Sequence, residues 1–392
     1  MSESGISSEK SITVMEMFES TVNEVPDEEA LFYEKEGKFT GISWNQYHKY
    51  VIYFAKALIS VGIKPFQTIN ILGFNSPEWF IAYIGGIFAC APPVGIYPTN
   101  SSDMCVYIAE SSECGCLVVD DILHYRKYEQ ELKKLKTLKV VIFYCDLNES
   151  EIKSLINPYV SIYLWKDFIN LGKKSTIDME LSSRVKMQKP GNCCTLIYTS
   201  GTTDIPKGVM LSHDNLTWTV KAIYNNYTHI IGDKQRFISF LPLSHIAGQM
   251  VDIFCNYILL ILIVTMITKS QVYFANPDAM SGSLVETMRK IKPTLFFGVP
   301  RIFEKFEEKI REVIESSMLI KRKIIKWSQK VGQKAVNNKF SGGNPPLFYK
   351  IANFFIFSRV REALGFNIRE KNLQSIKYFK NLLNFIFIIF SN

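Results

Sequence analysis

The residues best suited to chemistry lie between positions 195 and 213, in the stretch TLIYTSGTTDIPKGVMLSH. A turn that binds polyphosphate needs converging backbone N–H groups, small residues that let the phosphates approach, hydroxyl donors and one cation. The centre of this stretch supplies these features through Thr199, Ser200, Gly201, Thr202, Thr203 and Lys207. The stretch therefore predicts a loop that binds a phosphate-bearing ligand.

The order of residues in the loop differs from that of a Walker A loop. A Walker A loop has a glycine directly before its lysine and a Ser or Thr after it, whereas here Pro206 precedes Lys207 and Gly208 follows it. Strand-like residues flank the loop on both sides, so we expect a hairpin rather than a strand leading into a helix. A Ser/Thr-rich surface turn without a ligand is the alternative, and the eleven residues 198–208 with their flanks argue against it.

Helix and strand signals alternate ahead of the loop. Ser43 and Gln46 are spaced as a capping box for a helix over 43–62, and Ser76 with Pro77 fits the first positions of the next helix. Short apolar runs between the helices are typical of buried strands. Repeated units of this length indicate the α/β fold class, with mainly parallel sheets covered by helices on both faces.

Later segments carry weaker signals. Residues 146–190 are polar and are interpreted as a link between two sub-sheets, whereas 236–245 and 294–300 are typical of strands. A long helical segment is predicted from Arg301 to about Lys334, with ten Lys or Arg against five Glu. This charge predicts a solvated helix face, and contact with an anionic membrane is the alternative left open.

The composition is that of a folded protein with room for more than one subdomain. The chain has 392 residues, of which 47% are hydrophobic and 21% charged. A formal net charge of +8 favours anionic ligands or a membrane surface. No basic stripe with interleaved aromatic residues appears, so no nucleic acid is expected as a partner. The eight cysteines show no paired CxxC spacing, which predicts reduced thiols rather than a zinc site.

Neither a membrane span nor a secretory signal is expected. The longest apolar run, at 257–267, has eleven residues, against the roughly 20 that span a bilayer, and is interpreted as a buried strand or helix. The first ten residues lack the basic and apolar regions of a signal peptide. We therefore expect a cytoplasmic location, with peripheral contact at the cytosolic face of the endoplasmic reticulum left open.

The stretch TLIYTSGTTDIPKGVMLSHDN resembles the phosphate-binding signature of the adenylate-forming, or AMP-binding, enzymes. Four further stretches are similar to the long-chain fatty acyl-CoA synthetases, most of all to the bubblegum type: NSPEWFIAYIGGIFACAPPVGIYPTNS, FLPLSHIAGQMVDIF, YFANPDAM and LFFGVPRIFEKFEEKI. The resemblance implies the large N-terminal domain of such an enzyme over 12–365, incomplete at its C-terminal end. Residues 1–11 and 366–392 would be tails, and the latter matches nothing we recognise in the family.

The resemblance implies a ligase that uses ATP, Mg²⁺ and coenzyme A on a long-chain fatty acid. The carboxylate of the acid would attack the α-phosphate, giving acyl-adenylate and pyrophosphate, and the thiol of coenzyme A would then displace AMP. Because the substrate itself is the nucleophile, the protein would position the reactants and stabilise charge. Magnesium would bridge the phosphates, and no residue is assigned as a metal ligand.

The resemblance also assigns roles to individual residues. Thr199 through Lys207 would hold the β and γ phosphates, a set that includes Asp204, Ile205 and Pro206. His245 would lie near the acyl carboxylate as the catalytic residue, and a histidine that caps a strand end is the alternative. The segment that resembles the acyl-tunnel lining comprises Gly298, Val299, Pro300 and Arg301. The histidines interpreted as structural are His48, His124, His213 and His229.

The sequence departs from the family pattern in the loop itself. Asp204 stands where the family has glycine, and a carboxylate about 5 Å from a phosphate at an effective dielectric constant of about 20 costs on the order of 3 kcal/mol. Residues 255–271 are also longer and more apolar than the corresponding link in the family. Two hypotheses follow: a long-chain fatty acid–CoA ligase, or a truncated acyl-chain-binding or regulatory protein with weak or no catalysis. Adenylation of a different acid is a third, weaker alternative.

Overall fold

The computed structural model describes a defined part of the chain: residues 9–155, 157–199, 205–227, 234–241, 264–294, 296, 300–315, 319–341 and 343–365. The chain divides into two compact units. The first comprises Met1–Asn226 with Leu241–Pro277, and the second comprises Tyr227–Phe240 with Asp278–Asn392. The domain boundaries predicted at residues 11 and 365 stay predictions.

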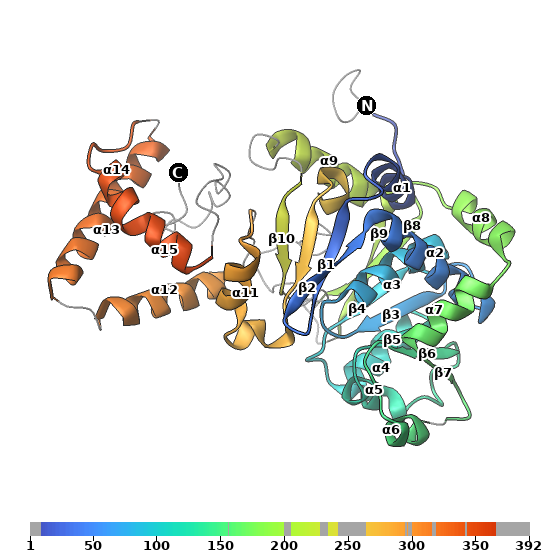
Figure 1. Ribbon diagram of the computed structural model, residues 1–392. Helices are drawn as coiled ribbons and strands as arrows, with labels where there is room; N and C mark the ends of the chain where they lie inside the picture. The colour runs from blue at the N-terminus through green and yellow to red at the C-terminus, as the bar shows by residue number, and fades with distance from the viewer. Residues whose placement is uncertain are drawn as a thin grey trace. The chain divides into compact units, whose positions relative to one another are not determined.

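A mainly parallel sheet forms the centre of the first unit (Figure 1). Its strands are, in spatial order, β7 (Ser161–Leu164), β6 (Val140–Phe143), β5 (Cys114–Val119), β3 (Thr68–Leu72), β4 (Pro93–Ile96), β8 (Cys193–Thr199) and β9 (Lys207–Ser212). All neighbouring strands run parallel except β8 and β9, which pair antiparallel. The predicted α/β class is confirmed. The central strands are buried throughout and mostly apolar because both faces of the sheet are covered; Thr68 and Asn70 of β3 are polar.

Helices join the strands and cover both faces. They are α1 (Val14–Glu24), α2 (Trp44–Ser60), α3 (Pro77–Phe88), α4 (Ser102–Ser111), α5 (Ile122–Glu129), α6 (Glu149–Ser154), α7 (Trp165–Lys174), α8 (Asp178–Met187) and α9 (His213–Tyr227). The predicted caps are confirmed: Ser43 and Gln46 form a capping box, and the Ser76 hydroxyl accepts the Trp79 N–H ahead of Pro77. These caps fix where α2 and α3 begin.

Two packed layers bury the faces of this sheet. On one face α4 and α5 cover a cluster that contains Leu72, Val94, Leu117, Val119, Phe143 and Tyr198. On the other, α2 packs against α3 and α7, where the Phe54 ring lies 5.4 Å from Trp165 and 5.3 Å from Phe168. Burial on both faces makes the sheet a rigid support for β8.

A second sheet in the first unit contains β1 (Glu29–Lys35), β2 (Lys38–Ser43) and β11 (Gln271–Phe274). β1 pairs antiparallel with β2 and parallel with β11. The rings of Phe32 and Tyr273 stack across the latter pair with centroids 4.3 Å apart. Segments separated by about 240 residues are thereby joined.

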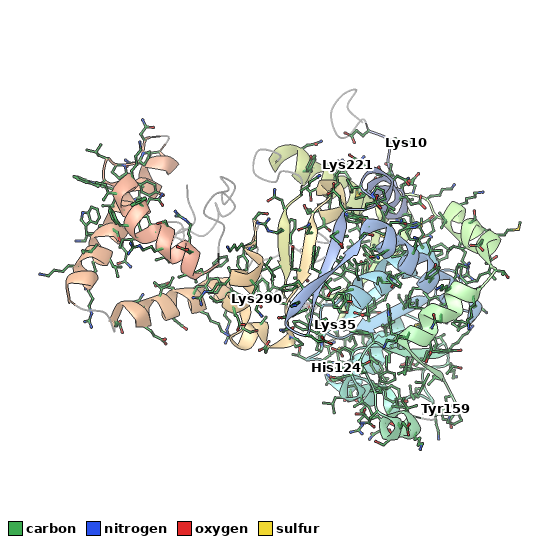
Figure 2. All side chains as sticks on the ribbon, viewed as in Figure 1. Lys10, Lys35, His124, Tyr159, Lys221 and Lys290 are labelled. Carbon is green, nitrogen blue, oxygen red and sulfur yellow. The ribbon has the colours of Figure 1, made fainter. Side chains whose placement is uncertain are left out.

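The N-terminal helix α1 is tied to distant segments of the first unit. The Thr21 hydroxyl donates to the carbonyl of Met266 at 2.9 Å, and the Thr217 hydroxyl donates to the carbonyl of Ile12 at 3.1 Å. Lys221 on α9 lies beside the N-terminal segment (Figure 2), where its ammonium pairs with Glu9 at 3.0 Å. Glu9 and Ile12 are therefore anchored to the helix that follows the loop.

Residues 146–190 are not a link between sub-sheets, so that interpretation is wrong. β7 pairs with β6 as the end strand of the main sheet, and α7 and α8 follow it. The apolar residues that hold these elements are few and scattered among polar ones: Val160, Phe168, Ile169 and Leu181 are buried. Because so few positions are apolar, the hydrophobic periodicity of this segment is weak in the sequence, although its helices and strand pack normally.

The second unit is mainly helical in its described residues. It contains β10 (Arg236–Ser239), all but the first residue of a 3₁₀ turn (Pro277–Ser281), α11 (Leu284–Ile291), α12 (Pro300–Glu315), α13 (Leu319–Phe340), α14 (Tyr349–Ala352), a π-helical turn (Asn353–Phe357) and α15 (Ser358–Ala363). The long helix predicted from Arg301 is two helices, α12 and α13. The strand predicted at 236–245 is confirmed over β10. Thr294 and Phe296 are not in a strand, against the prediction for 294–300.

The apolar run predicted to be a buried strand or helix is described only at its end. Residues 264–268 are helical, and Val264 and Met266 are buried. In the described part of the chain, no helix is long and apolar enough to cross a membrane. The seven cysteines in the same part are all free thiols.

Candidate functional site

The loop predicted to bind phosphate is carried by the hairpin of β8 and β9. The two strands are antiparallel, and their last paired residues are Thr199 and Lys207. The predicted hairpin is therefore confirmed, and both ends of the loop are held by the main sheet. Ser200, Gly201, Thr202, Thr203 and Asp204 lie outside the described residues, so their contacts with phosphate stay a prediction.

A buried threonine anchors β8 to its neighbours. The Thr195 hydroxyl accepts a hydrogen bond of 2.7 Å from the Tyr83 hydroxyl and donates one of 2.8 Å to the carbonyl of Pro93. Burial raises the pKa of Tyr83 well above its ordinary value, so its phenol stays protonated and remains a donor. The bonds join β8 to α3 and to the start of β4, four residues before the loop begins.

The end of β8 before the loop is held by Tyr198. Its side chain is buried against α4, and its hydroxyl forms a hydrogen bond of 2.7 Å with the Ser111 hydroxyl. Gly208 pairs with Tyr198 across the hairpin, and a Cβ at Gly208 would lie 3.1 Å from the Tyr198 ring. Glycine at this position thus lets the two strands close directly beside Lys207.

The far end of the hairpin is held by a buried histidine, His213. Its Nδ1 accepts the backbone N–H of Val14 at 3.2 Å, and its Nε2 lies 3.2 Å from the Oε1 of Gln188. Both contacts are made by a neutral ring that carries its proton on Nε2. Burial lowers the pKa of His213 to about 4, which keeps the ring neutral near pH 7. The structural role interpreted for His213 agrees with these bonds.

Lys207 is the cation predicted for the loop. Its side chain is exposed at the end of β9, and no carboxylate in the described part of the chain pairs with it. Its neighbours Pro206 and Ile205 are half-buried and exposed, respectively. The ammonium therefore remains available to an anionic ligand that approaches the loop, which fits the chemistry of a polyphosphate.

The other predicted site residues are described only in part. His245, Gly298 and Val299 lie outside the described residues, and their roles stay predictions. Pro300 is the first residue of α12, and Arg301 is exposed on the same helix in the second unit. Arg301 is therefore open to solvent on the surface of that unit.

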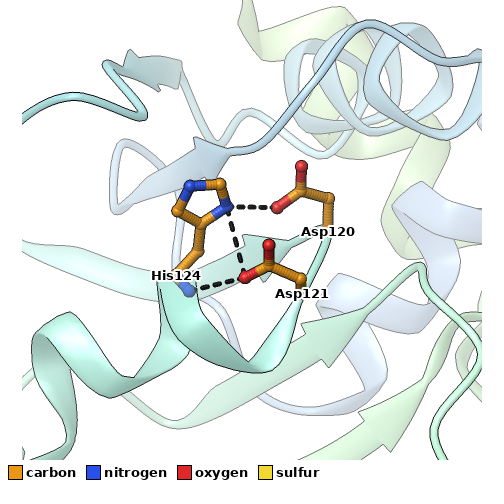
Figure 3. A group of neighbouring side chains, drawn as sticks. All are labelled: Asp120, Asp121 and His124. Atoms are coloured by element: carbon orange, nitrogen blue, oxygen red, sulfur yellow. Dashed lines mark hydrogen bonds and ion pairs between the residues drawn. The ribbon is translucent and has the colours of Figure 1, made fainter. Parts of the chain in front are cut away.

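A cluster of Asp120, Asp121 and His124 lies where β5 meets α5 (Figure 3), with ligand atoms within 4.8 Å of one another. The Nδ1 of His124 contacts Asp120, and Asp121 caps α5 by accepting the His124 N–H at 2.6 Å. Asp120 also accepts the Phe74 N–H at 2.7 Å. The hydrogen bond from Asp120 is the main reason that the pKa of His124 is raised. Two hydrogen bonds account for this cluster without a metal ion. One joins the His124 ring to the Asp120 carboxylate, and the other is the N-cap bond that Asp121 accepts.

The fold and the hairpin can be compared with known proteins. Residues 18–346 match the sequence model of a family described as AMP-binding enzyme. This chain belongs to the AMP-binding enzyme family. The family predicted from the loop and its flanks is thus confirmed, and the loop lies within the matched residues.

The curated relatives of this AMP-binding enzyme include three whose names agree on one activity. A Xenopus laevis protein named long-chain-fatty-acid–CoA ligase ACSBG2 is 41% identical over 368 residues, 93% of this chain and 48% of its own length. The human ACSBG2 protein is 37% identical over 93% of this chain and 52% of its own. The rat ACSBG1 protein is 36% identical over 92% of this chain and 48% of its own. The chain spans about half the length of the curated relatives it matches.

Solved structures agree with the fold of an AMP-binding enzyme. The adenylation domain of a carboxylate reductase from Mycobacterium chelonae superposes with a TM-score of 0.65 over 92% of this chain and 57% of its own, at 18% identity. The A domain of a carboxylic acid reductase from Segniliparus rugosus, bound to AMP and a carboxylic acid, gives 0.62 over 78% of this chain and 52% of its own, also at 18% identity. At such identities the likeness concerns the fold alone.

Proposed function

We propose that this chain is the ATP-binding and acyl-binding part of a long-chain fatty acid–CoA ligase. One observation carries the proposal: the β8–β9 hairpin closes at Thr199 and Lys207 and leaves the Lys207 ammonium exposed and unpaired in the described part of the chain. The names of the three curated relatives also support the proposal, because each is named a long-chain-fatty-acid–CoA ligase.

In the proposed reaction, the carboxylate oxygen of the fatty acid attacks the α-phosphate of ATP, and pyrophosphate leaves. The thiol of coenzyme A then attacks the acyl carbonyl, and AMP leaves. Loop residues 199–207 would hold the β and γ phosphates, with Lys207 as the point charge and the hydroxyls and backbone N–H groups as donors. Magnesium bound to ATP would neutralise part of the phosphate charge.

The remaining predicted residues keep their roles within this proposal. His245 would lie near the acyl carboxylate, and Gly298, Val299, Pro300 and Arg301 would line the path of the acyl chain. Since long-chain fatty acids partition into bilayers, peripheral contact with a membrane, such as the cytosolic face of the endoplasmic reticulum, forms part of the proposal. No nucleic acid is part of it.

A second candidate function is an acyl-chain-binding or regulatory protein with little catalysis. One feature of the sequence favours it: Asp204 places a carboxylate inside the loop that would hold the phosphates. Like charges at short range disfavour binding. The two candidates differ in whether ATP is consumed.

One assay separates them. The 392-residue chain is incubated with ATP, Mg²⁺ and palmitate, and pyrophosphate release and palmitoyl-adenylate are measured, with Lys207→Gln as the inactive control. The ligase predicts both products, and palmitoyl-CoA once coenzyme A is added. Palmitate binding without either product would overturn the ligase and support the second candidate.

A further inference from the structure

One face of the helical segment that ends the described chain is apolar and open to solvent. Its exposed side chains fall within nine residues that run from a turn through α14 into the π-helical turn. They are Leu347, Phe348, Ile351, Phe354 and Phe355. Leu347 is 87% exposed and Phe354 is 72% exposed. Five large apolar residues exposed within nine positions are unusual for a surface that meets only water.

The opposite face of the same segment is already packed. Ala352 and Phe357 are buried, and Val331 of α13, Tyr349 and Ile356 pack against them. The segment is apolar on both sides, with one side satisfied within the second unit and the other not.

α13 extends the exposed face with aromatic and basic side chains. Trp327 is 39% exposed, and its ring lies 6.3 Å from that of Phe348 at an angle of 70°. Ile324, one turn earlier, is exposed as well. Lys323 and Lys330 stand one turn to either side of Trp327 along the helix and are exposed.

Charge is concentrated in the same part of the chain. Residues 319–365 contain ten Lys or Arg and one acidic residue, Glu362, which gives this stretch a formal charge of +9, whereas the whole chain carries +8. In the described part of the chain no carboxylate pairs with these exposed cations: Lys323, Lys326, Lys330, Lys334, Lys350 and Arg359. The net positive charge of the protein is thus concentrated in this stretch of the sequence.

We propose that this surface docks on the anionic headgroups of a lipid bilayer. We call it the basic aromatic face: Ile324, Trp327, Leu347, Phe348, Ile351, Phe354 and Phe355, with the exposed cations around them. The inference deepens the membrane contact of the proposed function, and its test uses neither ATP nor fatty acid.

Both the apolar and the basic side chains of the basic aromatic face match the chemistry of a bilayer surface. Aromatic and aliphatic side chains gain from transfer into the boundary between headgroups and acyl chains, and tryptophan is well suited to that depth. Lysine and arginine can bury their stems beside these residues and keep their charged ends among the lipid phosphates. A face with apolar residues alone would suit another copy of the chain equally well. The surplus of unpaired positive charge disfavours such a contact, because two copies would bring like charges together.

The experiment measures binding of the full chain to vesicles. The chain is sedimented with vesicles of phosphatidylcholine alone and with vesicles that also contain phosphatidylserine, each at low and high salt. We expect strong binding only to the phosphatidylserine vesicles, weakened by salt. Equal binding to both vesicle types, or none to either, overturns the proposal.

Variants assign the binding to this face. Replacing Lys323, Lys326 and Lys330 together by Gln should weaken binding on the order of a hundredfold, at roughly fivefold for each charge. Phe354→Ser with Phe355→Ser should weaken binding as well, and because both side chains are exposed the fold is retained. Matched controls are Lys173, Lys174 and Lys186 replaced together by Gln, and Met179→Ser, all exposed in the first unit. Equal losses in the controls would overturn the assignment.

Two further measurements keep the outcomes distinct. A concentration-dependent dimer in sedimentation velocity that Phe354→Ser abolishes, without vesicle binding, would assign the face to a second copy and overturn the proposal. Pyrophosphate release from ATP and dissolved palmitate is measured on the same variants. Lost vesicle binding with retained release would separate the docking surface from the ligase, so either can fail without the other.

Discussion

The Tyr83 hydroxyl donates a hydrogen bond of 2.7 Å to the hydroxyl of Thr195, a residue 112 positions later in the chain. The bond links α3 to β8, four residues before the predicted phosphate loop. Both side chains are buried. The geometry of the loop therefore depends on a helix that contains none of the residues predicted to touch a ligand.

Removing this bond should loosen β8. Tyr83→Phe is expected to lower the free energy of unfolding by about 1 kcal/mol, the net value of a typical buried hydrogen bond. Urea unfolding followed by circular dichroism measures the change. Tyr128→Phe is the control, since Tyr128 is equally buried but its hydroxyl has no hydrogen-bond partner among the described residues. Equal losses in the two variants would contradict the role given to Tyr83.

His213 should make stability fall on acidification. Its pKa is lowered to about 4 in the folded chain, against about 6.5 when unfolded. Below pH 6.5 the unfolded ring takes up a proton that the folded ring does not, so stability is lost as pH falls toward 4, by about 2 kcal/mol at pH 5. The difference in unfolding free energy between the wild type and His213→Gln should shrink by that amount between pH 7 and pH 5. A constant difference would mean that His213 does not titrate as described.

His124 should behave in the opposite sense. Its pKa is raised, first by the hydrogen bond with Asp120, so its contribution to stability is present below about pH 6.5 and is lost as pH rises through the raised pKa. Asp120→Asn should lower the pKa of His124, as measured by NMR of the imidazole protons across a pH series. Asp121→Asn keeps an N-cap and should lower the pKa less. An unchanged pKa in Asp120→Asn would refute the ion pair.

Lys207 should matter for nucleotide binding and little for stability. Because its side chain is exposed, Lys207→Gln should change the free energy of unfolding by less than about 0.5 kcal/mol. The same change should weaken ATP binding roughly ten- to a hundredfold through the lost charge-assisted contact. Isothermal titration calorimetry measures the affinity, with the exposed Lys173→Gln as control. Unaltered ATP affinity would show that Lys207 does not reach the phosphates.

Asp204 should oppose ATP binding. Asp204→Gly is expected to tighten the affinity for ATP by up to about a hundredfold, which corresponds to the roughly 3 kcal/mol of charge repulsion. Asp204→Asn removes the charge but keeps the side chain, so it separates repulsion from backbone conformation. Should neither variant differ from the wild type, the carboxylate points away from the phosphates.

The sequence predicted most of the elements that carry the hairpin, because their signals are local. Ser43 with Gln46 and Ser76 with Pro77 mark helix starts through contacts made within one turn. The hairpin itself follows from strand-like residues on both sides of the loop. The same logic failed at 146–190, where Phe168 and Leu181 hold α7 and α8 through packing on distant helices rather than through a strong periodic pattern.

The supports of the site could not be found from the sequence. Nothing in the sequence distinguishes Thr195 from other threonines, because its hydrogen bonds with Tyr83 and Pro93 exist only in the fold. The contacts of His213 with Val14 and Gln188 depend on the fold in the same way. Their partners are dozens to nearly two hundred residues away, and no spacing rule connects them. The basic aromatic face could not be predicted either, since clustered apolar residues ordinarily indicate a buried face.

The anchoring of α1 bears on how the chain is made. Its apolar face can pack against α2 and α3 soon after they leave the ribosome, but Thr217, His213 and Met266 are synthesised about 200 or more residues later. At a synthesis rate of about 5 to 20 residues per second, these hydrogen bonds can form only roughly 10 to 40 seconds after the first helix is made. During that interval, the helix is held only by its contacts with segments already synthesised.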